Sequence, residues 1–258
     1  MQLSDLGLGI TPDGTTQRGL LVGTTQSGKS TLAGVLLAQW RRAYTDSVTL
    51  FVDTKPRFMA TKELSGLSAR GRYKHWRAGA HVPHSIALPP GYLSRQDLEQ
   101  AIDLARQDTP PNQGVALILQ TDDRSMYDHF NELITWFYKG ATKRYWRMVY
   151  MDEMRAFMAG SRSLQSGAVT IITSGAERGV GFLGATQRPR WIPAEALTEM
   201  SKLYLFKTDY SEDIQHLRQM GIGQSFRAPQ ERHTFHYFDK TSGADSWLRL
   251  PTALAKRA

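Results

Sequence analysis

The chain has 258 residues, a formal net charge of +8 and no cysteine. The lack of cysteine excludes disulfides, a thiol nucleophile and cysteine-ligated metal centres, and 41% hydrophobic with 22% charged residues is typical of a globular protein. No apolar run approaches the roughly 18 residues of a membrane-spanning helix, and the first residues lack the pattern of a signal peptide. We therefore expect a cytoplasmic protein, and the basic charge favours a polyanionic partner, nucleic acid before an acidic membrane surface.

The first part of the chain predicts two strands that bracket a helix. A short apolar strand at 18–22 runs into a glycine-containing loop, a helix follows over about 28–44, and a β-branched strand covers 47–53. Such a βαβ unit is expected to pair its strands in parallel. The next stretch, about 55–80, is predicted to be a basic insertion, because 55–78 holds seven lysines and arginines against one acid.

The rest of the chain continues to alternate strands with helices. The further predicted strands are 84–88, 114–120, 148–151, 180–186 and 202–208. The further predicted helices are 94–107, about 125–142, 164–178, 192–200 and 211–220. Segments 233–238 and 246–250 predict a C-terminal β-hairpin. This alternation predicts an α/β fold with a central, mainly parallel sheet and helices on both faces. We interpret residues 1–258 as one domain with the insertion and a C-terminal extension from about 222.

The segment GTTQSGKS, residues 23–30, has the G-x-x-x-x-G-K-[ST] spacing of a phosphate-binding loop between a strand and a helix. Backbone N–H groups at a helix N-terminus bind phosphate oxygens. Lys29 is expected to reach the β- and γ-phosphates, and Ser30 to give Mg²⁺ a hydroxyl ligand. The predicted cofactors are ATP and Mg²⁺, although the motif does not select ATP over GTP. The predicted nucleotide-binding residues are Gly23, Thr24, Thr25, Gln26, Ser27, Gly28, Lys29, Ser30 and Thr31.

Two carboxylates, Asp152 and Glu153, directly follow the apolar strand 148–151. The carboxyl ends of parallel strands line the crevice in which nucleotides bind. Asp152 is expected to hold Mg²⁺ through water, and Glu153 to orient and deprotonate the attacking water. A nucleotide hydrolase needs that base and a small-molecule kinase does not. The pair therefore favours hydrolysis; the alternative is a strand that merely ends in solvated acids.

Gln187 follows another apolar strand, in the segment GVGFLGATQRP at 179–189. A polar side chain at the tip of a strand beside the acid strand can hydrogen-bond the γ-phosphate or the attacking water, and so sense hydrolysis. At least one strand, 47–53, is expected between the loop strand and the acid strand. GTPases lack that arrangement, and their base-reading N-K-x-D motif is absent from this sequence.

The loop, the Asp152-Glu153 pair and the ATQRP segment together resemble the FtsK–HerA superfamily of DNA-pumping P-loop ATPases, over roughly residues 18–208. The resemblance implies a RecA-like core, a hexameric ring with nucleotide between neighbouring subunits, and double-stranded DNA as the partner. Within the superfamily, the short chain is most similar to the genome-packaging ATPases of internal-membrane icosahedral DNA viruses. That similarity implies capsid or portal-vertex proteins as further partners, and a place in the host cytoplasm or at the packaging vertex of the virion.

The resemblance also implies an arginine supplied across the subunit boundary, which offsets charge on the γ-phosphate during hydrolysis. Arg178 matches the position where members of the superfamily often carry it. Arg162 and Arg188 are competitors for the same role. The plainer interpretation is that Arg178 caps the C-terminal end of the helix predicted over 164–178.

DNA in the pore of a ring is expected to contact basic loop residues, which bind phosphates in a sequence-independent and salt-sensitive way. The predicted insertion supplies the first candidates, interleaved with Tyr73 and Trp76; they are Arg70, Arg72, Lys74 and Arg77. The alternative is an ordinary solvated insertion. A second basic group is expected either to contact DNA or to pair with acids of an adjacent subunit. This group comprises Lys139, Lys143, Arg144 and Arg147.

These features predict an enzyme that hydrolyses ATP to ADP and phosphate and couples this reaction to DNA translocation. Three other functions stay open at this point. A conjugation or plasmid-transfer ATPase shares the motor and differs in its partners. A P-loop kinase is disfavoured by Glu153, Gln187 and the basic charge, and a non-hydrolysing nucleic-acid-binding protein leaves the aligned motifs unexplained.

Overall fold

Nine strands form the central sheet of the computed structural model, which describes residues 3–53, 85–88, 99, 102–103, 105–107, 109, 111–120, 127–141, 146–159, 163–164, 166–221 and 229–251. The basic insertion expected at 55–80 lies outside the described residues. Among the described residues, no helix is long and apolar enough to cross a membrane.

The strands of this sheet are β1 (Arg18–Val22), β2 (Val48–Asp53), β3 (Ser85–Leu88), β4 (Val115–Gln120), β5 (Arg147–Met151), β8 (Val180–Thr186), β9 (Lys202–Phe206), β10 (Thr234–Asp239) and β11 (Ala244–Arg249). A separate antiparallel pair comprises β6 (Met158–Ala159) and β7 (Ser163–Leu164). The α-helices with defined bounds are α1 (Lys29–Ala43), α3 (Tyr127–Lys139), α4 (Ser166–Ser174), α5 (Ala194–Thr198) and α6 (Ser211–Gln219). Short 3₁₀ turns are η1 (Leu3–Leu6), η5 (Met154–Phe157), η6 (Ala176–Arg178) and η7 (Pro189–Trp191).

The strand order across the sheet is β11-β10-β9-β1-β8-β5-β2-β4-β3. The seven strands from β9 to β3 run parallel to one another, and the expected C-terminal hairpin, β10 and β11, adds to the β9 edge in antiparallel pairing. The mainly parallel α/β fold and the hairpin are thus confirmed. One expectation is wrong in space: β8, not β2, lies between β1 and β5, because the chain returns to the centre of the sheet after β5.

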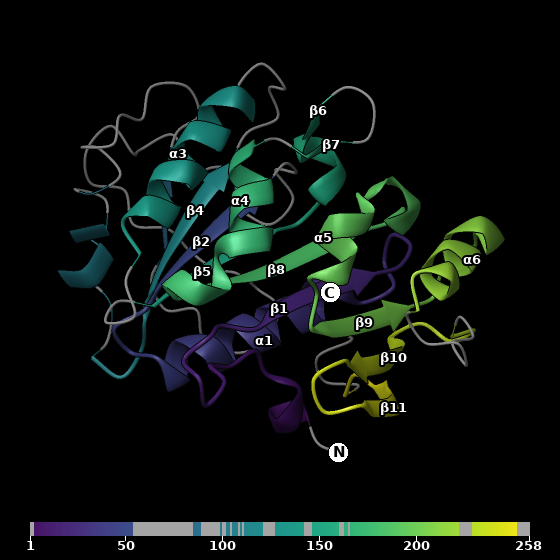
Figure 1. Ribbon diagram of the computed structural model, residues 1–258. Coiled ribbons are helices and arrows are strands. Elements are labelled where there is room, and N and C mark those ends of the chain that lie inside the picture. Colours follow the sequence, from purple (N-terminus) through teal and green to yellow (C-terminus); the bar gives the residue numbers. More distant parts are fainter. Residues whose placement is uncertain are drawn as a thin grey trace.

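Helices cover both faces of the sheet because successive strand residues point to opposite sides. Leu20 and Val22 join one apolar cluster with α3, α4, α5 and α6, whereas Leu21 between them joins a second cluster with α1 and the N-terminal segment. Figure 1 shows the same layers, with α3, α4 and α5 on one face and α1 on the other. Buried side chains therefore hold helices against both faces of the sheet. A functional site is then expected at the carboxyl or the amino ends of the strands.

Strand register brings the ends of the central strands to one level. Val22, the last residue of β1, pairs with Thr186 of β8, and Met151 of β5 pairs with Gly184 of β8. The residues that follow these strands, Gly23, Asp152 and Gln187, therefore emerge together at the carboxyl edge of the sheet.

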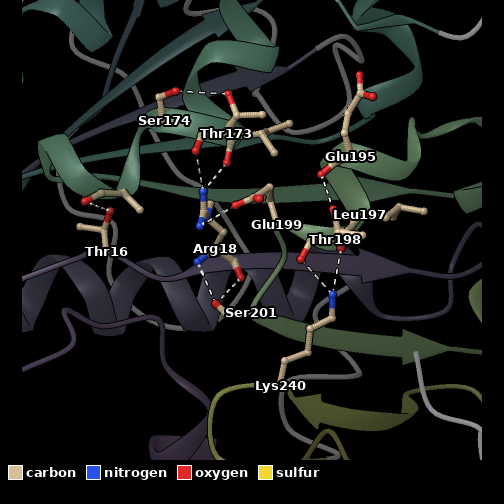
Figure 2. A network of polar contacts seen from close by, with 12 residues as sticks. Thr16, Arg18, Thr173, Ser174, Glu195, Leu197, Thr198, Glu199, Ser201 and Lys240 are labelled. Atoms are coloured by element: carbon tan, nitrogen blue, oxygen red, sulfur yellow. Dashed lines mark hydrogen bonds and ion pairs between the residues drawn. The ribbon is translucent and has the colours of Figure 1, made fainter. Parts of the chain in front are cut away.

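The opposite, amino edge is held by polar contacts within the chain (Figure 2). Arg18 Nη1 donates to the carbonyl of Thr173 at 3.3 Å, at the C-terminal end of α4, and Arg18 Nη2 lies 2.9 Å from Glu199. Lys240 Nζ donates to the carbonyls of Leu197 and Thr198 at 3.1 and 3.2 Å, at the end of α5. Cations satisfy the last carbonyls of a helix and its negative dipole end, so these residues serve the fold.

The helix predicted over 164–178 is wrong in its extent. The observed helix, α4, covers only Ser166–Ser174. The β6–β7 pair precedes it, and the separate turn η6 follows it. At Gly175 the amide donates to Ile171, and the chain then turns through Gly179, whose φ of 81° suits glycine. The helix predicted over 211–220 is α6, with Tyr210 at the N-cap position and no side-chain cap hydrogen bond.

Candidate functional site

The loop at 23–30 adopts a conformation that glycine makes possible. Gly28 precedes α1 with a φ of 110°, where a side chain is strained, and a Cβ there would come within 2.9 Å of Leu250 Cδ1. A Cβ on Gly23 would lie 2.7 Å from Phe206 Cβ. Both glycines of the motif therefore let the backbone pass close to neighbouring strands.

The N-terminus of α1 lacks the features that would satisfy it internally. Its N-cap, Gly28, has no side-chain hydrogen bond, and the first turn carries no acidic residue. The first amides of a helix have no partner within the helix, and together with the dipole they attract anions. The loop is anchored on both sides, by Gly23 N to Thr186 O at 3.1 Å and Thr24 N to Lys207 O at 2.8 Å. This arrangement fits a phosphate group.

Lys29 lies across the mouth of the loop. Its Nζ donates to the carbonyls of Gly23 at 2.6 Å and Thr24 at 2.8 Å. The ammonium group is thus held over the concave side of the loop, within the same residues that would wrap a phosphate. Phosphate oxygens can replace the two carbonyls as acceptors without a change in the position of the helix.

Asp152 is buried at the end of β5 and lies against the start of α1. Its Oδ1 accepts a hydrogen bond from Ser30 Oγ at 3.3 Å and another from the Tyr150 hydroxyl at 2.9 Å. Tyr150 was missed by sequence reasoning. The available signal was its spacing, because residues two apart on a strand face the same side.

The hydroxyl of Ser30 and the carboxylate of Asp152 form an oxygen donor set. Mg²⁺ is bound through one or two such protein oxygens, with water and substrate phosphates completing its shell. Among the described residues, no group of three or more histidines or acids could hold a metal by itself. With the oxygens of Ser30 and Asp152, the site fits a cation whose other ligands are water and phosphate oxygens.

Gln187 joins the loop to the second acid. Its Oε1 accepts from Thr25 Oγ1 at 3.1 Å, and its Nε2 donates to Glu153 Oε2 at 3.4 Å. The Thr25–Gln187 contact was not expected from the sequence. The loop, the acid strand and the sensor strand thus meet through one side chain, beside the position where the end of a bound triphosphate would lie.

Replacing Tyr150 with phenylalanine is expected to raise the Mg²⁺ concentration needed for half-maximal phosphate release roughly tenfold, because partners of ligating carboxylates contribute on this order to metal affinity. The control is Tyr237→Phe, which removes another buried hydroxyl, 3.3 Å from Asp239 in β10. A Mg²⁺ titration of both variants measures the effect, and equal curves for the two would contradict the role of Tyr150.

Arg178 lies away from the loop of its own chain. It occupies η6, just before β8, and the seven residues of β8 span about 20 Å before Gln187 emerges at the carboxyl edge. The helix-cap interpretation fails because α4 ends at Ser174. Instead, the exposed guanidinium lies 5.2 Å from the centre of the Tyr138 ring. Arg178 therefore does not reach the loop of its own chain.

Arg188, a competitor for the same role, is engaged within its own chain. Its Nε lies 2.9 Å from Asp213 Oδ2 in α6, and its guanidinium stacks 3.8 Å from the Tyr210 ring. Burial raises the pKa of Asp213 above its ordinary value, against the opposing effect of Arg188. The contacts assign Arg188 to holding α6 against the sensor strand. Arg162 lies outside the described residues.

Replacing Arg188 with alanine is expected to lower the free energy of unfolding by about 3 kcal/mol, because Asp213 is fully buried and would lose its cationic partner. Glu212→Gln is the control, since the Arg190–Glu212 pair is exposed and worth roughly 0.5 kcal/mol. Urea denaturation measures both. A loss of hydrolysis with unchanged stability would instead make Arg188 a catalytic arginine.

The basic groups predicted to contact DNA lie largely outside the described residues. These are Arg70, Arg72, Lys74, Arg77, Lys143 and Arg144. Lys139 is exposed at the end of α3. Arg147 was wrongly placed in the second basic group. Its Nη1 donates to the carbonyl of Phe137, and burial lowers the pKa of its guanidinium to about 10. It packs 4.6 Å from the Phe137 ring and serves α3 rather than a surface.

The parallel order β9-β1-β8-β5-β2, with the GTTQSGKS loop after β1 and two acids after β5, is the arrangement of the predicted RecA-like P-loop fold. No protein-family model and no curated protein sequence matches the chain. Solved structures do match in fold.

The genome packaging NTPase B204 from Sulfolobus turreted icosahedral virus 2, in complex with AMP, has a TM-score of 0.61 at 15% identity, over 91% of this chain and 97% of that one. Its complex with ATP-gammaS has a TM-score of 0.57 at 12% identity, over the same shares. The pCW3 conjugation coupling protein TcpA, with ATPgS, has a TM-score of 0.54 at 10% identity, over 95% of this chain and 66% of that one. The predicted resemblance is thus confirmed at the level of the fold.

Proposed function

We propose that this chain is an ATP-hydrolysing translocase of double-stranded DNA, and that it acts as a viral genome-packaging motor. The observation that carries the proposal is the contact of Gln187 with both Thr25 and Glu153. This contact links phosphate binding, a candidate base and a third strand in one site. The likeness in fold to the packaging NTPase B204, over 91% of this chain, supports the viral assignment.

Hydrolysis in this site follows from the placement of its own residues. The loop amides and Lys29 hold the β- and γ-phosphates, and Glu153 accepts a proton from the water that attacks the γ-phosphorus. The bond from that phosphorus to the oxygen bridging it to the β-phosphate breaks, which gives ADP and phosphate. Ser30 and Asp152 would hold Mg²⁺, which would supply positive charge to offset that of the phosphates. Gln187 reports the state of the γ-phosphate to β8.

The assembly in this proposal is a ring, with six subunits as the expected number. We assign Arg178 to the site of a neighbouring subunit, and its position at the far edge of the sheet from the loop of its own chain supports this assignment. The net charge of +8 suits passage of a polyanion. Capsid or portal-vertex proteins are the further partners, with the ATPase in the host cytoplasm or at the packaging vertex of the virion.

A second candidate is a conjugation or plasmid-transfer ATPase. The fold similarity to the coupling protein TcpA, at a TM-score of 0.54, favours it specifically. Both candidates use the same motor and differ in what delivers and receives the DNA. Genes for capsid proteins beside this one would support packaging, whereas a neighbouring relaxase gene would support conjugation.

The test of the proposed function is phosphate release with and without duplex DNA across a salt series. We expect duplex DNA to stimulate release severalfold at low salt. Because phosphate contacts displace counterions, the stimulation should fall steeply between about 50 and 200 mM salt. No stimulation at any salt would overturn the translocase assignment. Heparin is the control, and equal stimulation by heparin would reduce the effect to general polyanion binding.

A further inference from the structure

The sheet determines on which side of the loop the nucleoside of a bound triphosphate lies. Asp152, Glu153 and Gln187 lie after β5 and β8, on one side of the loop that follows β1. A triphosphate that points its γ end at these residues must send its ribose and base to the other side of β1. The strands on that side are β9 and then β10. This argument rests on the proposed function.

His233 is the residue immediately before β10, and it contacts the phosphate-binding loop. Its backbone N–H donates to the carbonyl of Ser27 at 3.1 Å, and its own carbonyl accepts from Leu250 N at 2.8 Å. A Cβ on Gly28 would come within 3.0 Å of His233 Nδ1, so the imidazole lies against the loop backbone. The hairpin thus meets the loop through one half-buried histidine.

The backbone at His233 is strained. Its φ is 63°, in the left-handed region that side chains disfavour. Among the described non-glycine residues, only Gln26, inside the phosphate-binding loop, also has a positive φ. Strained residues of this kind persist where the surrounding structure holds them, and they gather at ligand-binding sites. A glycine would adopt the same conformation without strain, so the side chain of His233 calls for an explanation.

The imidazole also has a hydrogen-bonding atom that the described residues do not satisfy. Nδ1 of His233 is buried and has no hydrogen-bond partner among them. Buried polar atoms normally have partners. By contrast, Nε2 of His236, three residues on, contacts Asp245, and the His236 ring stacks on Trp247 at 4.9 Å. The hairpin therefore uses the imidazole of His236 through Nε2 and the ring face, although Nδ1 of His236 is also unsatisfied, whereas His233 is held in the hairpin by its backbone alone.

We propose that His233 contacts the nucleoside part of the bound nucleotide and makes the start of β10 a recognition element for ribose and base. Nδ1 is buried against the loop, and the flat imidazole, which is half-buried, offers its exposed part to the nucleoside. The hairpin thereby contributes affinity for the nucleoside, while the loop contributes affinity for the phosphates.

The test compares ATP with inorganic tripolyphosphate as ligands in calorimetric titrations of the full chain with Mg²⁺. Tripolyphosphate has the phosphates and lacks the nucleoside. His233→Gly removes the side chain and suits the left-handed backbone, so its melting temperature should be unchanged or higher. For this variant we expect about a tenfold loss of ATP affinity, which is roughly the effect of losing one hydrogen bond. Its affinity for tripolyphosphate should be unchanged. His233→Asn, which tolerates the same backbone and keeps polar atoms, should lose less.

The outcomes separate this inference from the proposed function. Unchanged ATP affinity in His233→Gly would overturn the role of His233 while leaving the ATPase assignment intact. Equal losses for ATP and tripolyphosphate would also overturn it, because His233 would then only support the loop. If the wild-type chain bound neither ligand, the proposed function would fail, and this inference with it.

Discussion

Replacing Glu153 with glutamine should reduce steady-state phosphate release roughly a thousandfold, within the range that a general base contributes, and leave ATP affinity nearly unchanged. Glutamine keeps the size of the side chain and its contact with Gln187 but cannot accept the proton of the attacking water. Phosphate release and equilibrium ATP binding, measured on the same preparation, test the expectation together.

The matched control for that variant is Glu177→Gln. Glu177 is exposed in η6, at the opposite edge of the sheet from the loop. The Glu177→Gln variant should retain the wild-type rate of phosphate release. DNA-stimulated hydrolysis that survived in Glu153→Gln would remove Glu153 from the role of base, and one of the remaining polar groups near the loop would have to replace it.

Replacing Lys29 with alanine should weaken ATP binding on the order of a hundredfold and remove measurable turnover. The Lys29 ammonium lies over the loop, 2.6 and 2.8 Å from two of its carbonyls, and charge-assisted hydrogen bonds to phosphate are about twice as strong as neutral ones. Calorimetric titration with ATP measures the loss.

Lys139→Ala serves as the control for that loss, because Lys139 is exposed at the end of α3 and changes the net charge equally. Both variants should melt at temperatures close to that of the wild type. Tight ATP binding by Lys29→Ala would show that the loop holds phosphates through its amides alone, and would contradict the proposed role of Lys29.

Features with a local pattern could be predicted from the sequence. The loop at 23–30 is recognisable because the glycines that shape its backbone and the lysine that faces the phosphates all lie within eight consecutive residues. The strand before Asp152 and Glu153 is recognisable because it is apolar throughout, as a strand buried on both faces must be. The hairpin was predicted from the segments 233–238 and 246–250, and β10 and β11 pair as expected.

The order of the strands in space has no local pattern. Residues 180–186 insert between β1 and β5, although they come later in the chain than both. The sequence analysis expected this strand beside the acid strand, which is correct, but it placed strand 47–53 between the loop strand and the acid strand, where β8 lies. The contact of His233 with Ser27 is of the same kind, since it joins positions that lie far apart in the chain.

Arginines show why charge alone is a poor guide to function. Arg147 stood in a basic group and Arg188 was a candidate for the arginine in trans, yet one packs against Phe137 and the other against Asp213 and Tyr210. Whether a guanidinium lies on the surface depends on what its neighbours in space cover, and that is decided by tertiary packing. Arg178, by contrast, is exposed, which keeps it as the proposed arginine in trans.

The central claim is that hydrolysis in this site moves double-stranded DNA. The direct measurement is displacement of a third strand bound at one end of a long duplex. We predict ATP-dependent displacement by the wild-type chain, with none for Glu153→Gln and none when ATP is replaced by a non-hydrolysable analogue. ATP hydrolysis stimulated by duplex DNA without displacement of the third strand would contradict the claim.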